Sequence, residues 1–517
     1  MKIALLSFCL LLFSFAITSC DQTEDPPIID DPTNPSDNDN DDNLFDFIVK
    51  YINSQEEEPI SLKLKIDLGF MPNAESNWRI ILKAIETAQK FVALDLSECT
   101  MDMHSKKNFD PYVEIKSGED KIVSLILPVV AADISGHFER DKITFNHFSN
   151  LEYIKGEKIE HIGAGAFYDC VKLKKAEFPI VNDIMQSAFR GCENLLEANF
   201  PFLMILDKNV FSGCVALETV NFPELEFILD DTFNNCTSLK TVTIPKAKYI
   251  GQRAFYNCSS LTKADFPLVE TLGNEAFRNC VKLETVIFQK IKIIYARSFF
   301  NCVSLINIDF SSAVHIADHA FYNCTSLVEV VFPKVMIVEP MSFANCTSLT
   351  TARFYADPMR TSEDHPRKDW LKWYEEDGQV GLPKKIVSED SIYIHNDTFK
   401  GCISLSTLDI RNAWNVFFAV NSLADIGTHL DIYLYDDIGI PDEKNKRSYG
   451  HPQTEWFLGG QAGGIRTVYS IKFILPFVGN ENESQIKKAI SPGRHGIWIQ
   501  LGDKNQYDIV AEIERLP

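Results

Sequence analysis

The sequence predicts a mostly β solenoid with an α+β region at its N-terminus and a cap at each end. The first observation is a pattern of Phe, two residues and Cys that returns at strict 22-residue intervals, at Phe167, Phe189, Phe211, Phe233, Phe255, Phe277, Phe299, Phe321 and Phe343. The second is that Leu follows each of these cysteines by three residues, and Ile, Leu or Val precedes each Phe by five. A fixed period of about 20 to 50 residues is typical of stacked units, none of which can bury its apolar face alone.

The composition argues against one class of partner. The 517-residue chain has 72 acidic and 50 basic residues, so its formal net charge is −22. Such a chain would repel a phosphate backbone, and we expect no nucleic-acid partner. A solenoid can take up this length as one body, so length alone does not predict the number of domains.

Residues 1–20 are predicted to be a lipoprotein signal peptide. After Lys2 comes an apolar run of about fifteen residues, which is shorter than the roughly 20 needed to span a bilayer. The run ends in ITSC, with Cys20 last, which resembles the bacterial lipobox. The resemblance implies that Cys20 becomes the first residue and is lipidated, and several acyl chains would hold the protein to a membrane. A plain secretory signal with an incidental Cys20 is the alternative.

Residues 21–43 are predicted to be a disordered acidic tether. They contain nine acidic residues, four prolines and no Lys or Arg. Such a segment cannot bury enough apolar surface to offset the entropy of ordering it, and extended it would span roughly 70 Å. The acids behind Cys20 resemble the surface-export signal of lipoproteins in Bacteroidetes-type bacteria, which implies an outer-membrane lipoprotein exposed at the cell surface. A role in solubility alone is the alternative.

Residues 44–156 are predicted to form an N-terminal cap with degenerate repeats. Residues 61–68 alternate as a strand does, and Asn77 is expected to cap a helix that runs to about Lys90. Trp78 lies on the apolar stripe of this helix, so we expect it in the core rather than in a ligand site. Two more stretches look like degenerate repeat strands, residues 92–99 and 121–128. Atypical end units fit the need of a solenoid end for a polar outer face.

Residues 157–410 are predicted to be the regular solenoid, in which each unit runs strand, turn, short strand, turn. In the unit that begins at Phe255, the positions predicted to point inward are Leu261, Ala264, Phe266, Val269, Leu272, Ala276, Phe277 and Cys280. Pro267 has no amide hydrogen for a sheet, so it is expected to end the long strand and turn the corner. Burial of these side chains contributes roughly 10 to 25 kcal/mol, whereas ordering 22 residues costs a comparable or larger amount. One unit alone should not fold, but a stack can.

The frame AFxxCxxLxxVxFPxVxxI resembles the bacterial leucine-rich repeats of the BspA-like type, found in surface proteins of gut and oral bacteria and of some protists. The match covers nine consecutive units and a tenth, FKGCISL, that begins at Phe399. It implies a right-handed leucine-rich-repeat solenoid. Family members are described as adhesins or surface antigens that bind host matrix proteins or other cells, which implies a similar role here. Gln289, Ser311 and Tyr355 replace the corner proline and should loosen those corners without threatening the fold.

Ten of the 13 cysteines, from Cys170 to Cys402, share one position in the repeat. The chain has no CxxC, so zinc-ribbon spacing is missing, and we expect neither a metal nor a cofactor. Stacking would bring these cysteines within disulfide range, but we expect buried free thiols that act as small hydrophobes. Four Asn-Cys-Thr/Ser triplets match a glycosylation acceptor, and we interpret them as turn chemistry, at Asn235, Asn257, Asn323 and Asn345.

The open, concave face of the predicted sheet is the candidate ligand surface. One outward column along it supplies the candidate binding residues Glu177, Asn199, Asn221, Thr243, Asp265, Asp309 and Arg353. A neighbouring column, from Lys175 to Thr351, holds mainly Thr, Lys and Glu. Together they would form a polar, nearly charge-balanced stripe that stays open to a partner. A merely solvated face is the alternative.

Two regions depart from the repeat after Phe354. An insertion at about residues 355–388 contains Trp370, Trp373 and Tyr374 at helical spacing, and insertions in repeat proteins are often on the binding face. These aromatics would suit sugar rings or a protein hot spot, with burial against the solenoid as the alternative. The last region is predicted to be a β-rich cap or a carbohydrate-binding module, residues 411–517.

The sequence predicts no enzyme. It contains no HExxH, no GxSxG, no phosphate loop and no Gly-rich dinucleotide turn. His315 and His319 are four residues apart but lie within a repeat, and we expect no metal pair there. The sequence favours a lipid-anchored surface protein that binds a host, matrix or neighbouring-cell protein along its open sheet. A glycan-binding lipoprotein and a structural spacer of the envelope are the alternatives.

Overall fold

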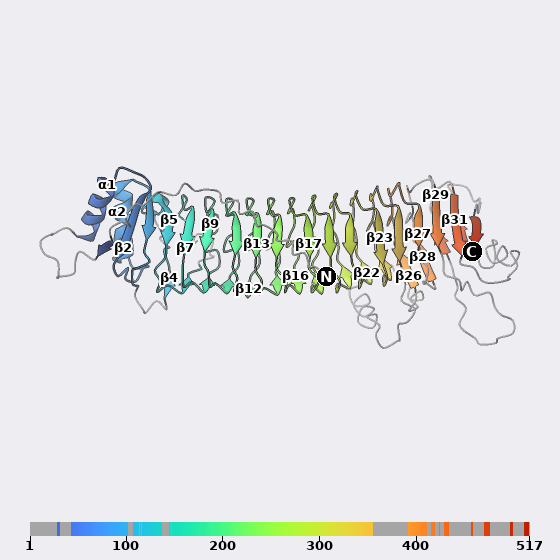
Figure 1. The fold of residues 1–517 in the computed structure, drawn as a ribbon, viewed down its shortest axis with the longest axis horizontal. Coiled ribbons are helices and arrows are strands. Elements are labelled where there is room, and N and C mark those ends of the chain that lie inside the picture. The colour runs from blue at the N-terminus through green and yellow to red at the C-terminus, as the bar shows by residue number, and fades with distance from the viewer. Residues whose placement is uncertain are drawn as a thin grey trace, which may run out of the picture.

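The protein is an elongated body with two rows of parallel strands along its length (Figure 1). In this computed structural model the described residues are 28–30, 43–101, 107–112, 114, 116–136, 144–145, 147–354 and 391–410, followed by Leu423, Ile426 and the backbone of short strands as far as residue 515. The two rows and the repeated turns confirm the predicted mostly β, leucine-rich-repeat solenoid.

Two helices pack against each other at the N-terminal end of the body (Figure 1). They are α1 (Leu44–Ser54) and α2 (Asn77–Ala88). Trp78 on α2 is fully buried, which confirms that it is a core residue. A short 3-10 helix, η2 (Glu119–Lys121), lies near α2.

The expected cap of α2 is wrong by one residue. Ser76 is the N-cap, and its side chain accepts a hydrogen bond from the backbone N–H of Arg79 at 3.4 Å. Asn77 is the first helical residue, and its side-chain amide instead donates to the carbonyl of Asp67 at 2.7 Å. The shorter Ser side chain fits the N-cap geometry, which leaves the amide of Asn77 free to tie the helix to the preceding loop.

The acidic segment predicted to be disordered contains one short strand. This strand, β1 (Ile28–Asp30), pairs in parallel with β2 (Ile60–Lys65). Ile29 is buried in the core. The prediction of disorder is therefore wrong for these three residues, because two β-branched side chains with high strand propensity meet the open edge of β2.

The long-strand row forms one side of the body, and its strands have three to six residues. Its members are β1, β2, β3 (Val92–Asp95), β5 (Ile122–Ile126), β7 (Tyr153–Lys155), β9 (Lys175–Glu177), β11 (Glu197–Asn199), β13 (Thr219–Asn221), β15 (Thr241–Thr243), β17 (Lys263–Asp265), β19 (Thr285–Ile287), β21 (Asn307–Asp309), β23 (Glu329–Phe332), β25 (Thr351–Phe354), β27 (Thr407–Asp409), β29 (His429–Tyr433), β31 (Ser470–Leu475) and β33 (Ala511–Arg515). Beyond β27, the strands β29, β31 and β33 continue the same parallel ladder.

The short-strand row runs along the lower edge of the body in Figure 1, and most of its strands have two residues. Its members are β4 (Asn108–Phe109), β6 (Asp133–Ile134), β8 (His161–Ile162), β10 (Asp183–Ile184), β12 (Ile205–Leu206), β14 (Phe227–Ile228), β16 (Tyr249–Ile250), β18 (Thr271–Leu272), β20 (Ile293–Ile294), β22 (His315–Ile316), β24 (Ile337–Val338), β26 (Ser391–Ile394) and β28 (Asn415–Phe418), with a separate pair β30 (Trp456–Leu458) and β32 (Ile497–Ile499).

The interior between the rows consists of continuous columns of identical side chains. The turn Phe rings stack from Phe167 to Phe399, with 4.9 to 5.7 Å between successive ring centroids. The eight positions predicted to point inward in the unit from Phe255 are all at most 3 % exposed. The corner after the long strand is a turn in the repeat that has Pro267. It is also a turn in the two repeats where Gln289 and Ser311 replace the proline. The predicted interior is confirmed, and the two described corners without proline keep the same turn.

The ten repeat cysteines are free and buried, as expected. Each thiol also donates a hydrogen bond to the carbonyl of a Phe in the preceding repeat, for example from Cys258 to Phe233 at 3.2 Å. Burial raises the pKa of Cys170 to about 12. The thiol is thus more than a small hydrophobe, because it gives a second hydrogen bond to a carbonyl that already accepts one from a backbone N–H, as Phe233 does from Cys236 at 3.1 Å.

The turn asparagines take a left-handed backbone conformation, with φ of 61° at Asn257 and 62° at Asn345. Gly191 and Gly213 occupy the same position in earlier repeats with φ of 74° and 80°. The side-chain amide of Asn257 donates to Asn235 of the neighbouring repeat at 2.8 Å. These contacts support the interpretation of the triplets as turn chemistry, because Asn and Gly tolerate this conformation best.

Candidate binding faces

The long-strand face, defined as the outward side chains of the long-strand row, contains all seven candidate residues of the first outward column. Parallel register places Asn199, Asn221 and Thr243 side by side on β11, β13 and β15. The same register aligns Asp265 with Asp309 through Ile287. Figure 1 shows this row along a nearly straight body, so the face is a long, flat strip with little concavity in that view.

Glu177 is already engaged at the N-terminal part of this face. Its carboxylate accepts a hydrogen bond from the Tyr153 hydroxyl at 2.6 Å and pairs with the Lys175 ammonium at 2.5 Å. These two contacts, with Lys175 first, lower the pKa of Glu177. Burial and the neighbouring carboxylate raise the pKa of Tyr153. A ligand at this position would therefore compete with an existing ion pair.

Other candidate side chains also contact one another. The amide of Asn221 donates to Asn199 at 3.0 Å, and Asp265 pairs with Lys263 at 2.7 Å. Asp309 accepts hydrogen bonds from the side chain of Gln289 and the backbone of Ser311, both at 3.2 Å.

Arg353 lies near the C-terminal part of the face. Its guanidinium contacts Glu329 and lies 4.0 Å from the buried carboxylate of Asp409. The long-strand face is thus a polar surface whose hydrogen-bonding groups are partly satisfied by each other.

Some candidate residues lie outside the described residues. They are the lipidation residue Cys20 and the aromatic insertion residues Trp370, Trp373 and Tyr374. Within the described residues, no helix has the length and apolar character that a membrane crossing requires.

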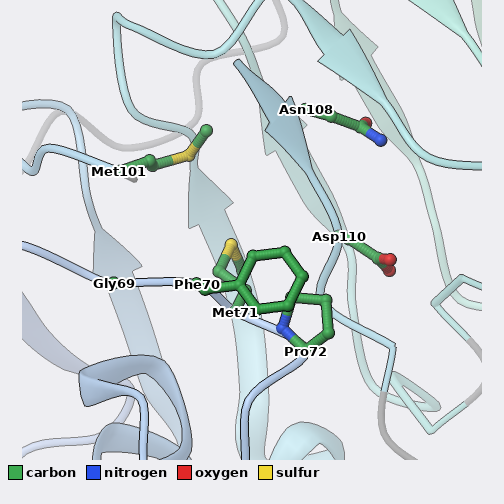
Figure 2. Close-up of a pocket in the computed structure, with 7 residues that line it drawn as sticks. All are labelled: Gly69, Phe70, Met71, Pro72, Met101, Asn108 and Asp110. Carbon is green, nitrogen blue, oxygen red and sulfur yellow. The ribbon is translucent and has the colours of Figure 1, made fainter. Parts of the chain in front are cut away.

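A small pocket in the N-terminal region was not predicted (Figure 2). Its volume is about 160 Å³, and it is lined by Gly69, Phe70, Met71, Pro72, Met101, Asn108 and Asp110. Ligand sites for small molecules usually enclose about 300 to 1,000 Å³. The pocket can therefore take at most one side chain, and the sequence carries no signal for it because these residues precede the regular repeat.

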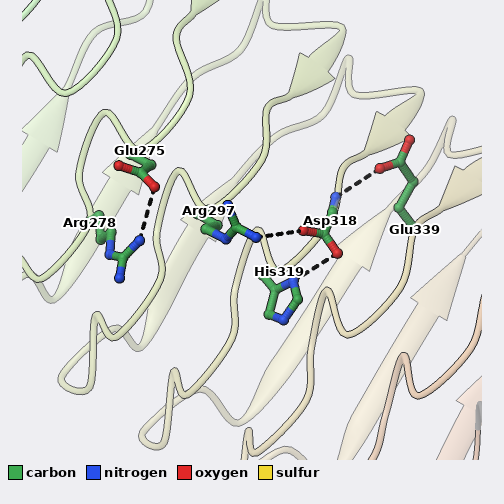
Figure 3. Close-up of polar contacts among 6 residues, drawn as sticks. All are labelled: Glu275, Arg278, Arg297, Asp318, His319 and Glu339. Atoms are coloured by element: carbon green, nitrogen blue, oxygen red, sulfur yellow. Dashed lines mark hydrogen bonds and ion pairs between the residues drawn. The ribbon is translucent and has the colours of Figure 1, made fainter.

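The edge formed by the turns carries a chain of polar contacts (Figure 3). Arg278 pairs with Glu275 at 2.9 Å, and its guanidinium lies 4.6 Å from the ring centre of Phe300 and 5.9 Å from that of Tyr256. Phe300 in turn stacks on Tyr322 with 4.8 Å between centroids. Arg278 and Tyr322 thus both pack on the ring of Phe300, which is engaged within this edge rather than left open for a sugar to stack on.

The two histidines that are four residues apart do not converge. His315 Nε2 lies 2.8 Å from Glu339. His319 Nδ1 lies 2.7 Å from Asp318 (Figure 3). Each imidazole thus faces its own carboxylate. No group of three or more His, Cys, Asp or Glu side chains suited to a metal occurs in the described part of the chain.

The outward column of the short-strand row is a feature that sequence reasoning missed. Its members occupy the position six residues before each turn Phe, and they are His161, Asp183, Ile205, Phe227, Tyr249, Thr271, Ile293, His315 and Ile337, of which His315 is buried. The signal was available, because the buried residue one position later marks the short strand. Five of the nine are large apolar or aromatic residues, in contrast to the polar long-strand face.

The comparisons with known proteins agree with the fold. Residues 140–240 and 226–350 match the BspA type Leucine rich repeat region, in six copies. No curated protein matches the chain.

Three solved structures of bacterial leucine-rich repeat proteins are similar to this chain. A protein from Bacteroides ovatus is 22% identical over 57% of this chain and 80% of its own, with a TM-score of 0.35. A leucine rich cell surface protein from Faecalibacterium prausnitzii is 21% identical over 62% and 88%, with a TM-score of 0.32. A leucine-rich repeat protein from T. pallidum is 23% identical over 34% and 77%, with a TM-score of 0.24. With their strict 22-residue units, stacked Phe columns and two parallel rows, the repeats of residues 140–350 are leucine-rich repeats of the BspA type.

Proposed function

We propose that this chain is a non-catalytic, lipid-anchored surface protein that binds an extracellular protein along its long-strand face. The observation that carries the proposal is the parallel register, which lines up outward polar side chains from strand to strand over β11 to β15. A protein partner can read such a strip through many spaced polar contacts, and leucine-rich repeat proteins commonly bind protein ligands.

The partner would be a host, matrix or neighbouring-cell protein. Its surface must offer donors and acceptors that match amide and hydroxyl groups, because Asn199, Asn221 and Thr243 carry no net charge. Binding would also displace the hydrogen bond between Asn199 and Asn221. We therefore expect each strand to contribute a small binding free energy, and these contributions to add up along the strip.

The test uses the purified full chain and a panel of immobilised extracellular matrix proteins. A triple variant, Asn199→Ala, Asn221→Ala and Thr243→Ala, removes the polar groups without touching the interior. A matched control changes two exposed residues away from the strip, Lys208→Ala and Gln252→Ala. The proposal expects at least a tenfold weaker signal for the triple variant and none for the control. Equal signals for both variants, or a signal on a glycan array but on no protein, would count against it.

The lipid anchor is tested separately. Cys20→Ser should move the protein from the membrane fraction to the soluble fraction, because acylation needs the thiol. Protease treatment of intact cells should degrade the wild-type body if it is displayed outside. A body that stays intact until the cells are lysed would contradict surface display.

A further inference from the structure

Five large apolar side chains gather in the open on the short-strand face. They are 42 to 66 % exposed, and they are Met185, Phe202, Met204, Ile205 and Phe227. Ile205 and Phe227 are neighbours in the outward column, on β12 and β14, which are in contact. Phe202 and Met204 belong to the corner that leads into β12, and Met185 directly follows β10. We call these five residues the short-strand patch.

The repeat does not require apolar residues at these places. Twenty-two residues later, Phe202 and Met204 are replaced by Glu224 and Glu226, and Thr271 occupies the column position of Phe227 two repeats on. Five half-exposed side chains of this size present on the order of several hundred Å², which is the size of the largest apolar patches on monomeric proteins. Such patches mark interaction sites when polar residues border them.

The border of the patch is acidic on one side. Asp183 is the direct register partner of Ile205, and Asp207 lies two residues after Ile205, just beyond the end of β12. Asp183 Oδ2 lies 3.6 Å from His161 Nδ1, while its Oδ1 is buried without a hydrogen-bond partner among the described residues. Burial raises the pKa of Asp183. The negative charge of Asp207 raises this pKa further, because the two carboxylates repel each other.

At the other border of the patch, the acidic side chains are neutralised by ion pairs. Glu224 and Glu226 pair with Lys246 and Lys248 at 2.5 and 2.8 Å. Positive charge on a partner would therefore be attracted to the side of Asp183 and Asp207. A second copy of this chain would bring the same two carboxylates and another net charge of −22.

We propose that the short-strand patch docks a basic amphipathic segment of a protein partner, with its large apolar side chains on the five patch residues and a Lys or Arg between Asp183 and Asp207. The patch lies on the short-strand row and the strip of the proposed function on the long-strand row, so a partner could use the patch independently. Its Met side chains adapt to different apolar shapes, which suits a surface that accepts a segment rather than a small ligand.

The test uses the full chain and two synthetic peptides of equal length. Both carry the same three Leu and Phe residues at helical spacing, but one has Lys and Arg at the flanking positions and the other has Glu. Fluorescence anisotropy should show binding of the basic peptide, at least tenfold weaker binding of the acidic one, and a decrease in affinity with added salt. Equal binding of the two peptides, or binding of neither, would overturn the proposal.

Variants locate the site. Phe202→Glu, Met204→Glu and Phe227→Thr introduce residues that the chain itself carries at these repeat positions, so the fold should tolerate them. This triple variant should bind the basic peptide at least tenfold more weakly than wild type. The Asp207→Asn variant should bind it about threefold to tenfold more weakly. The strip variant with Asn199, Asn221 and Thr243 changed to Ala should bind as wild type does. Unchanged binding by the patch variant would contradict the assignment. So would a dimer in light scattering that the patch variant dissociates, because it would show that a second copy covers the patch.

Discussion

The two faces of the solenoid differ in chemistry although the same 22-residue unit builds both. On the long-strand face, polar side chains contact one another from strand to strand, as Asn221 does with Asn199 and Tyr153 with Glu177. On the short-strand face, Ile205 and Phe227 stand exposed next to carboxylates that repel each other. The first face is stable in water as it is, whereas the second leaves apolar surface uncovered.

This difference shows that the repeat determines the interior and leaves both exteriors free. Leu, Phe and Cys recur because each must stack on its own kind in the next unit, while an outward position contacts mainly solvent. The comparison between interior and faces can be tested by substitutions in the shared interior, in the turns and on one face.

The largest effect should come from high pH acting on the buried thiols. Burial raises the pKa of Cys170 from 9.0 to about 12, so above pH 9 the unfolded chain has lost this proton while the folded chain keeps it. The free energy of unfolding should then fall as pH rises from 9 to about 12, by about 1.4 kcal/mol per pH unit for each thiol so buried. Urea unfolding at pH 8, 9 and 10 measures this slope. In Cys170→Ala the free energy of unfolding should fall less steeply with pH, by the contribution of one thiol. An unchanged slope would contradict the raised pKa of Cys170.

Two Phe residues of one repeat separate the interior from the short-strand face. Phe233 is buried in the stacked column, so Phe233→Ala should lower the free energy of unfolding by about 3 to 5 kcal/mol through the cavity it leaves. Phe227 is exposed, and Phe227→Thr should change the free energy of unfolding by no more than about 0.5 kcal/mol. Urea unfolding followed by circular dichroism compares the two. A similar loss for both would mean that Phe227 does not face water.

The turns should show an intermediate effect. Asn257→Ala places a β-carbon in a left-handed conformation and removes the hydrogen bond to Asn235, so we expect a loss of about 1 to 2 kcal/mol. Asn257→Gly should recover part of this loss, because Gly occupies the same position at Gly191 and Gly213. Thermal unfolding of both variants is the measurement, and an Ala variant as stable as the Gly variant would exclude a conformational cause.

The smallest effect should come from an ion pair on the long-strand face. Lys175 and Tyr153 lower the pKa of Glu177, so their contribution to stability is present above the ordinary pKa near 4.5 and is lost as the pH falls through the lowered value. Because 34 % of the Glu177 side chain remains exposed to solvent, Glu177→Gln should cost less than about 1 kcal/mol at pH 7. Thermal unfolding at pH 7 and pH 3 should show this difference only at the higher pH. A difference that persists at pH 3 would point to packing instead.

The interior was predictable residue by residue, and the details around it were not. The period alone identified the inward set from Leu261 to Cys280, because a side chain that recurs every 22 residues can pack only against its copies. The N-cap of α2 was misplaced by one residue, because both Ser76 and Asn77 can cap a helix. The strand at residues 28–30 was missed, because its acidic surroundings outweigh two isoleucines in any composition argument.

The candidate faces were only half predicted. The outward column of the long strands follows from alternation, so its members were identified correctly as neighbours. Their mutual contacts were not, since side-chain pairs such as Tyr153 with Glu177 depend on rotamers and on the stagger between strands. The short-strand patch was overlooked because a two-residue strand gives no alternation to recognise.

By itself the sequence determined the period, the stacked interior and the solenoid, because a side chain that must bury itself against its own copies leaves a regular trace along the chain. Only the tertiary structure decided which outward side chains satisfy each other and which remain exposed. That outcome depends on distances of a few ångströms between side chains on the same strand or on neighbouring strands, and an exposed position is under no packing constraint that would mark it in the sequence.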